Sequence, residues 1–353
     1  MSKIKVMIID DSALMRRIIN TLLSKDPDIE VVGSISNAVY ALNMIERLQP
    51  DIITLDIEMP GMDGLTALTE LRKKYPELPV IMCSSLTLNG ATVTLEALNR
   101  GANDYVTKPS SSGSAKDSFE QMSQDLLYKI KGLTSHLVKA APQPVVAKPQ
   151  TTSSSEPRAI HVLAIGVSTG GPNALTELLP KLPRDFPVPV VIVQHMPPVF
   201  TKILAENLSK KSALDVKEAV DGDILTPGTI FIAPGNYHMT VARDGLQTRL
   251  RLNQDPPENF CRPAVDVLFR SVAALYGKNT LSVIMTGMGQ DGMLGCKEIK
   301  QEGGLVIIQD QASSVVWGMP GAVYKEQLAD AVYPLTDLGG AIVQCVNRKG
   351  LLI

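Results

Sequence analysis

Short apolar runs alternate with stretches of helical periodicity along the first third of the chain. Five runs are predicted to be strands: Lys5–Ile9, Glu30–Ser34, Ile52–Leu55, Val80–Cys83 and Tyr105–Thr107. Helical patterns lie between them, as at Ala13–Ser24 and Ala38–Leu48. Strands that alternate with helices are typical of a parallel sheet. The pattern therefore predicts an α/β domain with five parallel strands.

A further helix is expected over Asp117–Lys139. Its apolar residues recur three or four positions apart and would form one stripe: Phe119, Met122, Leu126, Ile130, Leu133 and Leu137. The following stretch, Ala140–Pro157, contains four prolines and a Ser/Thr run but no periodicity. Such a composition is typical of an extended linker. We therefore expect one domain over residues 1–139, a linker over 140–157 and a second domain over 158–353.

The second half of the chain predicts another α/β domain. Its expected strands are His161–Val167, Val188–Gln194, Thr229–Ala233, Leu281–Met285 and Leu305–Gln309. The segment Asp215–Leu252 is different, because it has Gly, Pro and Asp turns between short alternating stretches. We expect it to form antiparallel strands or hairpins inserted in a mainly parallel core.

Composition excludes several classes of protein. The 353 residues are 44% hydrophobic, enough for two cores, and the net charge of −2 with no long basic run argues against a dedicated nucleic-acid binder. The N-terminus does not resemble a signal peptide, and no stretch reaches the roughly 18 apolar residues of a membrane span. The four scattered cysteines indicate reduced thiols. We expect a soluble cytoplasmic protein without membrane insertion.

Charged and hydroxyl side chains follow the predicted strands of the first domain. Asp10 and Asp11 follow the first strand, Asp56 the third, Ser84 the fourth and Lys108 the fifth. The carboxyl ends of parallel strands meet at one edge of a sheet, where ligands bind. Any one of the aspartates could be a loop or capping residue, but together they suit a hard cation such as Mg²⁺. A carboxylate there could also attack phosphorus and form an acyl phosphate.

These residues carry a resemblance to a known family. The stretches IIDDSALMRR, LDIEMPGMDG and YVTKP, together with Ser84, resemble two-component receiver domains. The resemblance implies a doubly wound, flavodoxin-like fold in which Asp56 is phosphorylated. It also implies that Asp10, Asp11, Asp56 and the backbone carbonyl of Glu58 hold Mg²⁺. Ser84 and Lys108 would contact the phosphoryl group, and Tyr105 occupies the position of the family's aromatic switch residue.

Ser168 lies in a glycine-rich turn between a predicted strand and a predicted helix. Its context, GVSTG, matches the G-x-S-x-G turn of a nucleophilic serine. A turn of this kind also suits phosphate binding, and the serine could simply cap the helix. His195 ends the apolar run VPVVIVQH, 27 residues after Ser168, a distance that fits one βαβ unit. The crossover would bring both residues to the same edge of the sheet, where His195 could act as a general base.

A carboxylate could complete the set. Asp291 follows another predicted strand in the segment LSVIMTGMGQDGMLG, although it could also cap the next helix. The order Ser, His, Asp differs from that of chymotrypsin-type, subtilisin-type and α/β-hydrolase enzymes. Backbone N–H groups near Thr169 or Met288 could bind an oxyanion.

The second half closely resembles the chemotaxis protein-glutamate methylesterases. The segments that carry this resemblance are GVSTGGP, IVQHMPP, RPAVDVLF, TGMGQDG and WGMPGAV. It implies a Rossmann-like esterase domain with Ser168 as nucleophile, His195 as base and Asp291 as orienting carboxylate, and no cofactor at that site. Ala264 departs from the family, which would have serine there.

The resemblance also implies a substrate, partners and a location. Proteins of this family remove methyl groups from glutamate esters of chemotaxis receptors, and many deamidate receptor glutamines. A histidine kinase of the chemotaxis system would donate the phosphoryl group, and recruitment to membrane receptor clusters would follow. Two alternatives stay open: an output domain that only binds DNA, nucleotide or protein, and a serine hydrolase that acts on small molecules.

Overall fold

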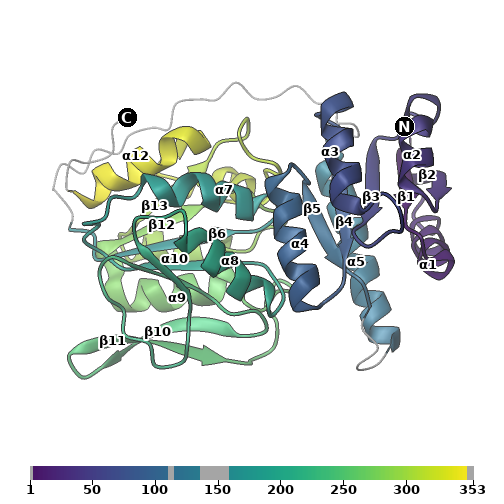
Figure 1. Ribbon diagram of the computed structural model, residues 1–353. Coiled ribbons are helices and arrows are strands. Elements are labelled where there is room, and N and C mark those ends of the chain that lie inside the picture. The colour runs from purple at the N-terminus through teal and green to yellow at the C-terminus, as the bar shows by residue number, and fades with distance from the viewer. Residues whose placement is uncertain (1–2, 110–114, 136–158, 348–353) are drawn as a thin grey trace. The chain divides into compact units, whose positions relative to one another are not determined.

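The computed structural model describes residues 3–109, 115–135 and 159–347 (Figure 1). The chain divides into two compact units, Met1–Gln143 and Pro144–Ile353.

The first unit is built on one parallel sheet. Its strands are β1 (Ile4–Ile9), β2 (Ile29–Ile35), β3 (Ile52–Asp56), β4 (Val80–Ser84) and β5 (Asp104–Thr107). Their order across the sheet is β2-β1-β3-β4-β5, and every neighbouring pair is parallel. The prediction of five parallel strands is confirmed. The strand order reverses between β1 and β3, which is where open α/β sheets form a ligand-binding crevice.

Capping residues begin the helices that follow the first four strands. These helices are α1 (Ala13–Leu23), α2 (Ala38–Leu48), α3 (Gly64–Lys74) and α4 (Leu88–Asn99). Each of the residues just before them accepts a hydrogen bond from a first-turn N–H through its side chain: Ser12, Asn37, Asp63 and Thr87. Such caps satisfy N–H groups that have no partner inside the helix.

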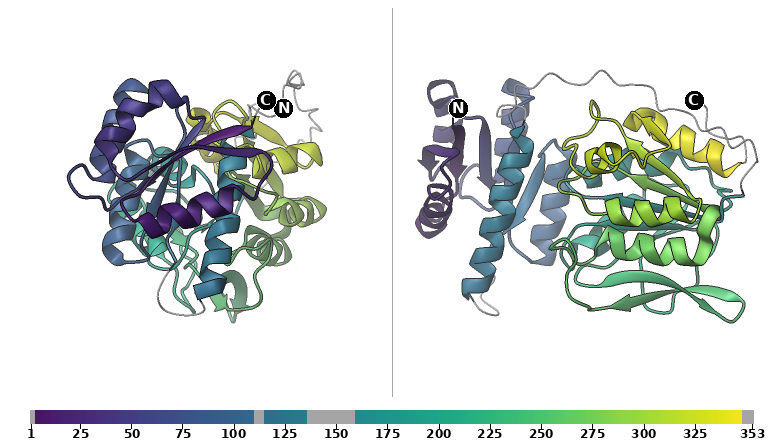
Figure 2. Two further views of the ribbon diagram at one scale, coloured as in Figure 1. Left: turned by 90° about the vertical axis from the view of Figure 1, so that its right-hand side faces the viewer. Right: turned by 180° about the vertical axis from the view of Figure 1, so that it is seen from behind.

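The last helix of the first unit is α5 (Ala115–Leu133), which runs beside the sheet (Figure 2). The predicted apolar stripe is buried at Met122, Leu126, Ile130 and Leu133. α5 ends at Leu133, and both Leu137 and the predicted end, Lys139, lie outside the described residues.

The second unit is built on a larger parallel sheet. Its strands are β6 (Val162–Val167), β7 (Val190–Gln194), β8 (Asp215–Glu218), β9 (Thr229–Ile232), β12 (Thr280–Ile284), β13 (Leu305–Gln309) and β14 (Ala331–Tyr333). Their order is β14-β13-β12-β6-β7-β9-β8. The chain leaves β6 toward β7 and later returns on the opposite side at β12. The reversal point of this sheet therefore lies between β6 and β12.

One expectation for the second unit needs correction. The prediction of antiparallel strands over Asp215–Leu252 holds only for β10 (His238–Asp244) and β11 (Gln247–Asn253), which form a two-stranded hairpin. β8 instead pairs in parallel with β9 at the edge of the main sheet. The turns around β8 suggested a hairpin, but tertiary pairing with β9 determines its direction.

Helices cover both faces of the second sheet. α7 (Gly171–Leu178) packs with α12 (Leu335–Val346), and α9 (Val265–Tyr276) packs with α10 (Met293–Gln301). Right-handed crossovers from β6 to β7 and from β12 to β13 place α7 and α10 on opposite faces. The hairpin lies along α9 (Figures 1 and 2). Two further helices complete the unit, α8 (Phe200–Ser209) and α11 (Met319–Lys325), with short 3-10 turns at Leu179–Lys181 and Gly277–Asn279.

None of the helices in the described ranges combines the length and apolar character needed to span a bilayer.

Candidate functional site

Ser168 lies in a tight turn directly after β6. Its N–H donates to the carbonyl of Thr286 beyond β12 (3.0 Å), and its carbonyl accepts the side-chain amide of Gln194 (3.0 Å). The turn needs glycine twice, because Gly170 has a φ of 78° and a Cβ on Gly171 would lie 1.9 Å from the Gln194 side chain. The turn is therefore held between the ends of β7 and β12.

His195 follows β7, the strand next to β6. Val167 and Gln194 are paired in register, and the N–H of His195 donates to the carbonyl of Val167 (3.2 Å). Ser168 and His195 thus occupy adjacent strand ends, as predicted from their spacing. In the described part of the chain, the Ser168 hydroxyl makes no hydrogen bond to His195. Hydrogen bonds between a nucleophile and its base are often long before substrate binds.

The Asp291 carboxylate forms hydrogen bonds with His195 and with four other groups. The His195 Nε2 atom lies 2.8 Å from Asp291 Oδ2. Four other donors bond the same carboxylate: the N–H groups of Val265, Asp266 and Gly292, and the Asn259 side chain. Asp291 does not cap the following helix, since the residue before α10 is Gly292 and no side chain caps this helix. Instead, Asp291 accepts hydrogen bonds from the N–H groups in the first turn of α9. The alternative prediction, that Asp291 caps the helix after it, is therefore wrong, because the helix that it caps is α9.

Opposite charges stabilise each other within this buried pair. Burial would lower the pKa of His195, but the side chains of Cys261 and Asp291 raise it above its ordinary value. Burial would likewise raise the pKa of Asp291, but His195 and the backbone N–H groups lower it. The pair therefore stabilises an imidazolium, the species that forms when a histidine takes a proton from a nucleophile.

Sequence reasoning missed two contacts of this site. Asn259 donates its side-chain amide to Asp291 (2.9 Å), and the Cys261 side chain helps to raise the pKa of His195. Neither residue lies in a stretch with a periodic pattern, and both reach the site through a turn distant in sequence from His195 and Asp291. Ala264, the departure from the family pattern, is buried just before α9, and its N–H donates to His238 Nδ1 (3.2 Å).

The two oxyanion candidates lie in the loops around the serine. Thr169 follows Ser168, and its carbonyl accepts the hydroxyl of Thr286 (2.9 Å). Met288 lies in the loop after β12 and is largely buried. The contacts assign neither N–H group to an oxyanion, so this role stays a prediction.

The first unit gathers three aspartates at the reversal point of its own sheet. Asp10, Asp11 and Asp56 each offer an oxygen, and these oxygens lie within 4.8 Å of one another. Lys108 reaches the same place, with its Nζ atom 2.7 Å from Asp56 Oδ1 and 3.0 Å from Asp10 Oδ2. The structure brings together the side chains that were predicted from four strand ends, except that of Ser84.

Asp56 keeps one oxygen available. Its Oδ2 atom is buried and has no hydrogen-bond partner among the described residues. Burial raises the pKa of Asp56 to about 6, although Lys108 acts in the opposite direction. A buried carboxylate oxygen without a donor is costly unless a cation or a covalent partner occupies the place beside it. The residues therefore fit a divalent cation with oxygen ligands.

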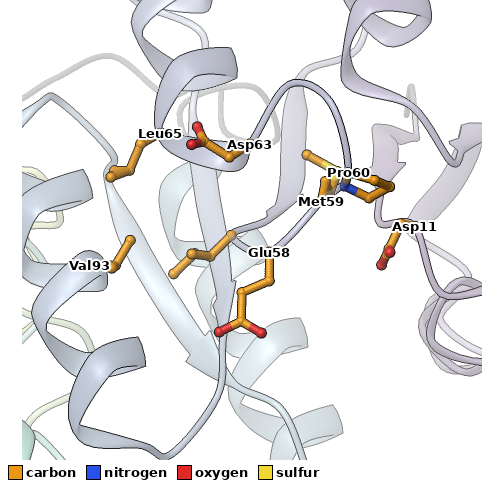
Figure 3. Close-up of a pocket in the computed structure, with 8 residues that line it drawn as sticks. Asp11, Glu58, Met59, Pro60, Asp63, Leu65 and Val93 are labelled. Atoms are coloured by element: carbon orange, nitrogen blue, oxygen red, sulfur yellow. The ribbon is translucent and has the colours of Figure 1, made fainter.

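An open depression of about 500 Å³ adjoins the acidic residues (Figure 3). Asp11 lines it together with Glu58, Met59 and Pro60 from the loop after β3. The N–H of Glu58 donates to Asp56 Oδ1 (3.3 Å). The loop therefore follows the Asp56 carboxylate closely, and Asp11 is the aspartate of this group that lines the depression.

Ser84 and Tyr105, the other two residues predicted for this site, make contacts away from its aspartate carboxylates. The Ser84 hydroxyl accepts from Thr94 (2.6 Å) and donates toward the carbonyl of Gly90 (3.2 Å). The ring of Tyr105 is buried beneath the Lys129 ammonium, which lies 5.0 Å from its centroid. Their expected roles toward a phosphoryl group stay predictions.

Comparisons with known proteins bear on both units. Residues 163–342 match the family model described as CheB methylesterase, and residues 6–119 match that of the response regulator receiver domain. A protein of Trichodesmium erythraeum named protein-glutamate methylesterase/protein-glutamine glutaminase is 50% identical, covering 98% of this chain and 100% of the relative. One of the same name from Nocardioides is 47% identical, covering 99% and 97%.

A solved structure also resembles the second unit. The CheB methylesterase catalytic domain of Thermotoga maritima is 42% identical, with a TM-score of 0.52, and the match covers 53% of this chain and 98% of that one.

Replacing Asp291 should destabilise the second unit. The change Asp291→Ala removes the cap of α9 and leaves buried donors without an acceptor, so we expect the unfolding free energy to fall by roughly 2–4 kcal/mol. Trp317 is the only tryptophan of the chain, so its fluorescence during urea unfolding reports this unit.

The matched control is Asp185→Ala, at an exposed position before β7, which should change stability by less than about 0.5 kcal/mol. Equal stability of the two variants would show that the Asp291 carboxylate does not support the fold.

Proposed function

The chain belongs to the CheB methylesterase family, and from this premise we propose that it hydrolyses glutamate γ-methyl esters of chemotaxis receptors under the control of phosphorylation. The products are methanol and a receptor glutamate. The same chemistry would convert receptor glutamines to glutamates with loss of ammonia, as the names of its relatives indicate. In this role the protein serves adaptation in chemotaxis.

The observation that supports the catalytic part best is the buried His195–Asp291 pair beside the serine turn. In our proposal, Ser168 attacks the ester carbonyl while His195 takes the hydroxyl proton, and Asp291 stabilises the imidazolium. N–H groups of Thr169 or Met288 would stabilise the oxyanion. The proton then passes from His195 to the departing methoxide. Water, activated by the same histidine, cleaves the acyl enzyme and frees Ser168.

The observation that supports control by phosphorylation is the free Oδ2 atom of Asp56 beside Lys108. Asp56 would attack phosphorus and form an acyl phosphate. Asp10, Asp11, Asp56 and the carbonyl of Glu58 would hold Mg²⁺. A bound Mg²⁺ supplies charge neutralisation at the phosphoryl oxygens. Lys108 would pair with the new phosphoryl group, and the Ser84 hydroxyl would turn toward it as Tyr105 changes its position.

The remaining parts of the proposal concern organisation and partners. We propose a receiver domain over residues 1–139, a linker over 140–157 and a catalytic domain over 158–353. The division of the chain at Gln143–Pro144 supports this arrangement. A histidine kinase of the chemotaxis system would donate the phosphoryl group, and the protein would work in the cytoplasm at receptor clusters.

Alanine variants of the three catalytic candidates test the esterase. Ser168→Ala and His195→Ala should each lower methanol release from methylated receptors by on the order of 10³-fold or more, and the double variant should be no slower than either alone. Asp291→Ala should lose most activity as well. His161→Ala, at an exposed position, is the control and should keep the wild-type rate. Near wild-type methanol release by Ser168→Ala would contradict the assignment.

Asp56→Asn tests the control by phosphorylation. Acetyl phosphate with Mg²⁺ should accelerate methanol release by the wild-type protein, because Asp56 is the acceptor. The variant should release methanol at the same rate with and without the donor. Asp28→Asn, at an exposed aspartate of the same unit, should respond like wild type. If the Asp56→Asn protein is accelerated as strongly as wild type, the phosphoacceptor is another residue.

A further inference from the structure

A two-residue turn adjoins the catalytic candidates. Glu258 and Cys261 exchange two backbone hydrogen bonds, of 3.1 and 2.9 Å, and Asn259 and Phe260 form the turn between them. Both turn residues are left-handed, with φ values of 52° and 62°. Turns of this kind favour asparagine followed by glycine. Asn259 fits this preference, but Phe260 occupies the position where glycine would be most favourable.

Folding does not account for the phenylalanine. The side chain of Phe260 is 100% exposed, so its ring contributes nothing to the core. A glycine would relieve the backbone and remove an apolar surface from water. A residue that strains the local backbone and does not pack in the core is expected at positions where function requires it.

The turn is fixed at several points to the catalytic candidates. The Asn259 amide donates to Asp291 Oδ1 and to Asp266 Oδ2, both at 2.9 Å. Glu258 forms a two-fold ion pair with Arg270 of α9, at 2.6 and 2.5 Å. Cys261, the residue after Phe260, helps to raise the pKa of His195. The turn that carries Phe260 is therefore bonded to the carboxylate that pairs with His195, and it cannot move far without disturbing Asp291.

We propose that Phe260 is a substrate-contacting residue whose ring packs on apolar side chains that flank the esterified glutamate of the receptor. The inference rests on the proposed function. It adds a residue by which the enzyme would distinguish a protein substrate from a small ester. The methyl ester itself is small, so the catalytic groups alone can recognise little of it. An aromatic ring on a fixed turn presents a large apolar surface and has few rotatable bonds to order when a neighbouring apolar surface binds it.

The variant Phe260→Gly separates this role from a structural one. Glycine suits the left-handed turn, so the urea midpoint reported by Trp317 should be unchanged or higher. The value of kcat/KM for methylated receptors should fall about tenfold, mainly through KM, because apolar contact is lost. Hydrolysis of p-nitrophenyl acetate, which carries no flanking side chains, should fall less than twofold. Phe260→Tyr keeps the ring and should keep most of the receptor activity.

Leu246 supplies a matched control. It is 99% exposed in the two-residue turn that joins β10 and β11, at the opposite end of the hairpin from His238. Leu246→Gly should leave both activities unchanged.

Two outcomes would overturn the inference. An unchanged kcat/KM for receptors in Phe260→Gly would show that the ring does not meet the substrate. A parallel loss on receptors and p-nitrophenyl acetate would show that the ring only orders the catalytic groups. Wild-type protein that hydrolyses the small ester but not methylated receptors would instead contradict the proposed function, and the inference with it.

Discussion

The reversal of strand order in each parallel sheet is the constraint on which both sites depend. In the first unit the reversal lies between β1 and β3, whose ends carry Asp10 and Asp56. In the second unit it lies between β6 and β12, and the loops that follow these strands carry Ser168 and Asp291. Helices leave the two central strands toward opposite faces, so the loops diverge and open a crevice. In the proposed function, one architecture thus provides both a place for phosphate chemistry and a place for acyl transfer.

The Asp291 carboxylate shows how closely the fold and the site are linked in the second unit. Its charge is buried and would be costly without partners. Five donors satisfy it, including two N–H groups that begin α9. The group that orients His195 is therefore also the cap of a core helix. The same carboxylate holds the Asn259 turn, so the position of Phe260 depends on it too.

Much of the fold and of the two sites could be predicted from the sequence, because apolar strands and the residues that directly follow them are local features. The predicted central strands agree with the structure, and His195 lies beside Asp291 as expected. The direction of β8 was not predictable, since its partner β9 decides it. The roles of Asn259 and Cys261 were also missed. Their contacts join segments that are distant in the chain, and no local pattern records such contacts.

The central claim is that His195 activates Ser168 as a nucleophile. The most direct measurement is covalent labelling with a fluorophosphonate, followed by peptide mapping of the modified residue. We expect one label, on Ser168, with a labelling rate that falls by on the order of 10²-fold or more in His195→Ala, since a general base contributes about that much. A label on another residue, or a rate that does not depend on His195, would contradict it.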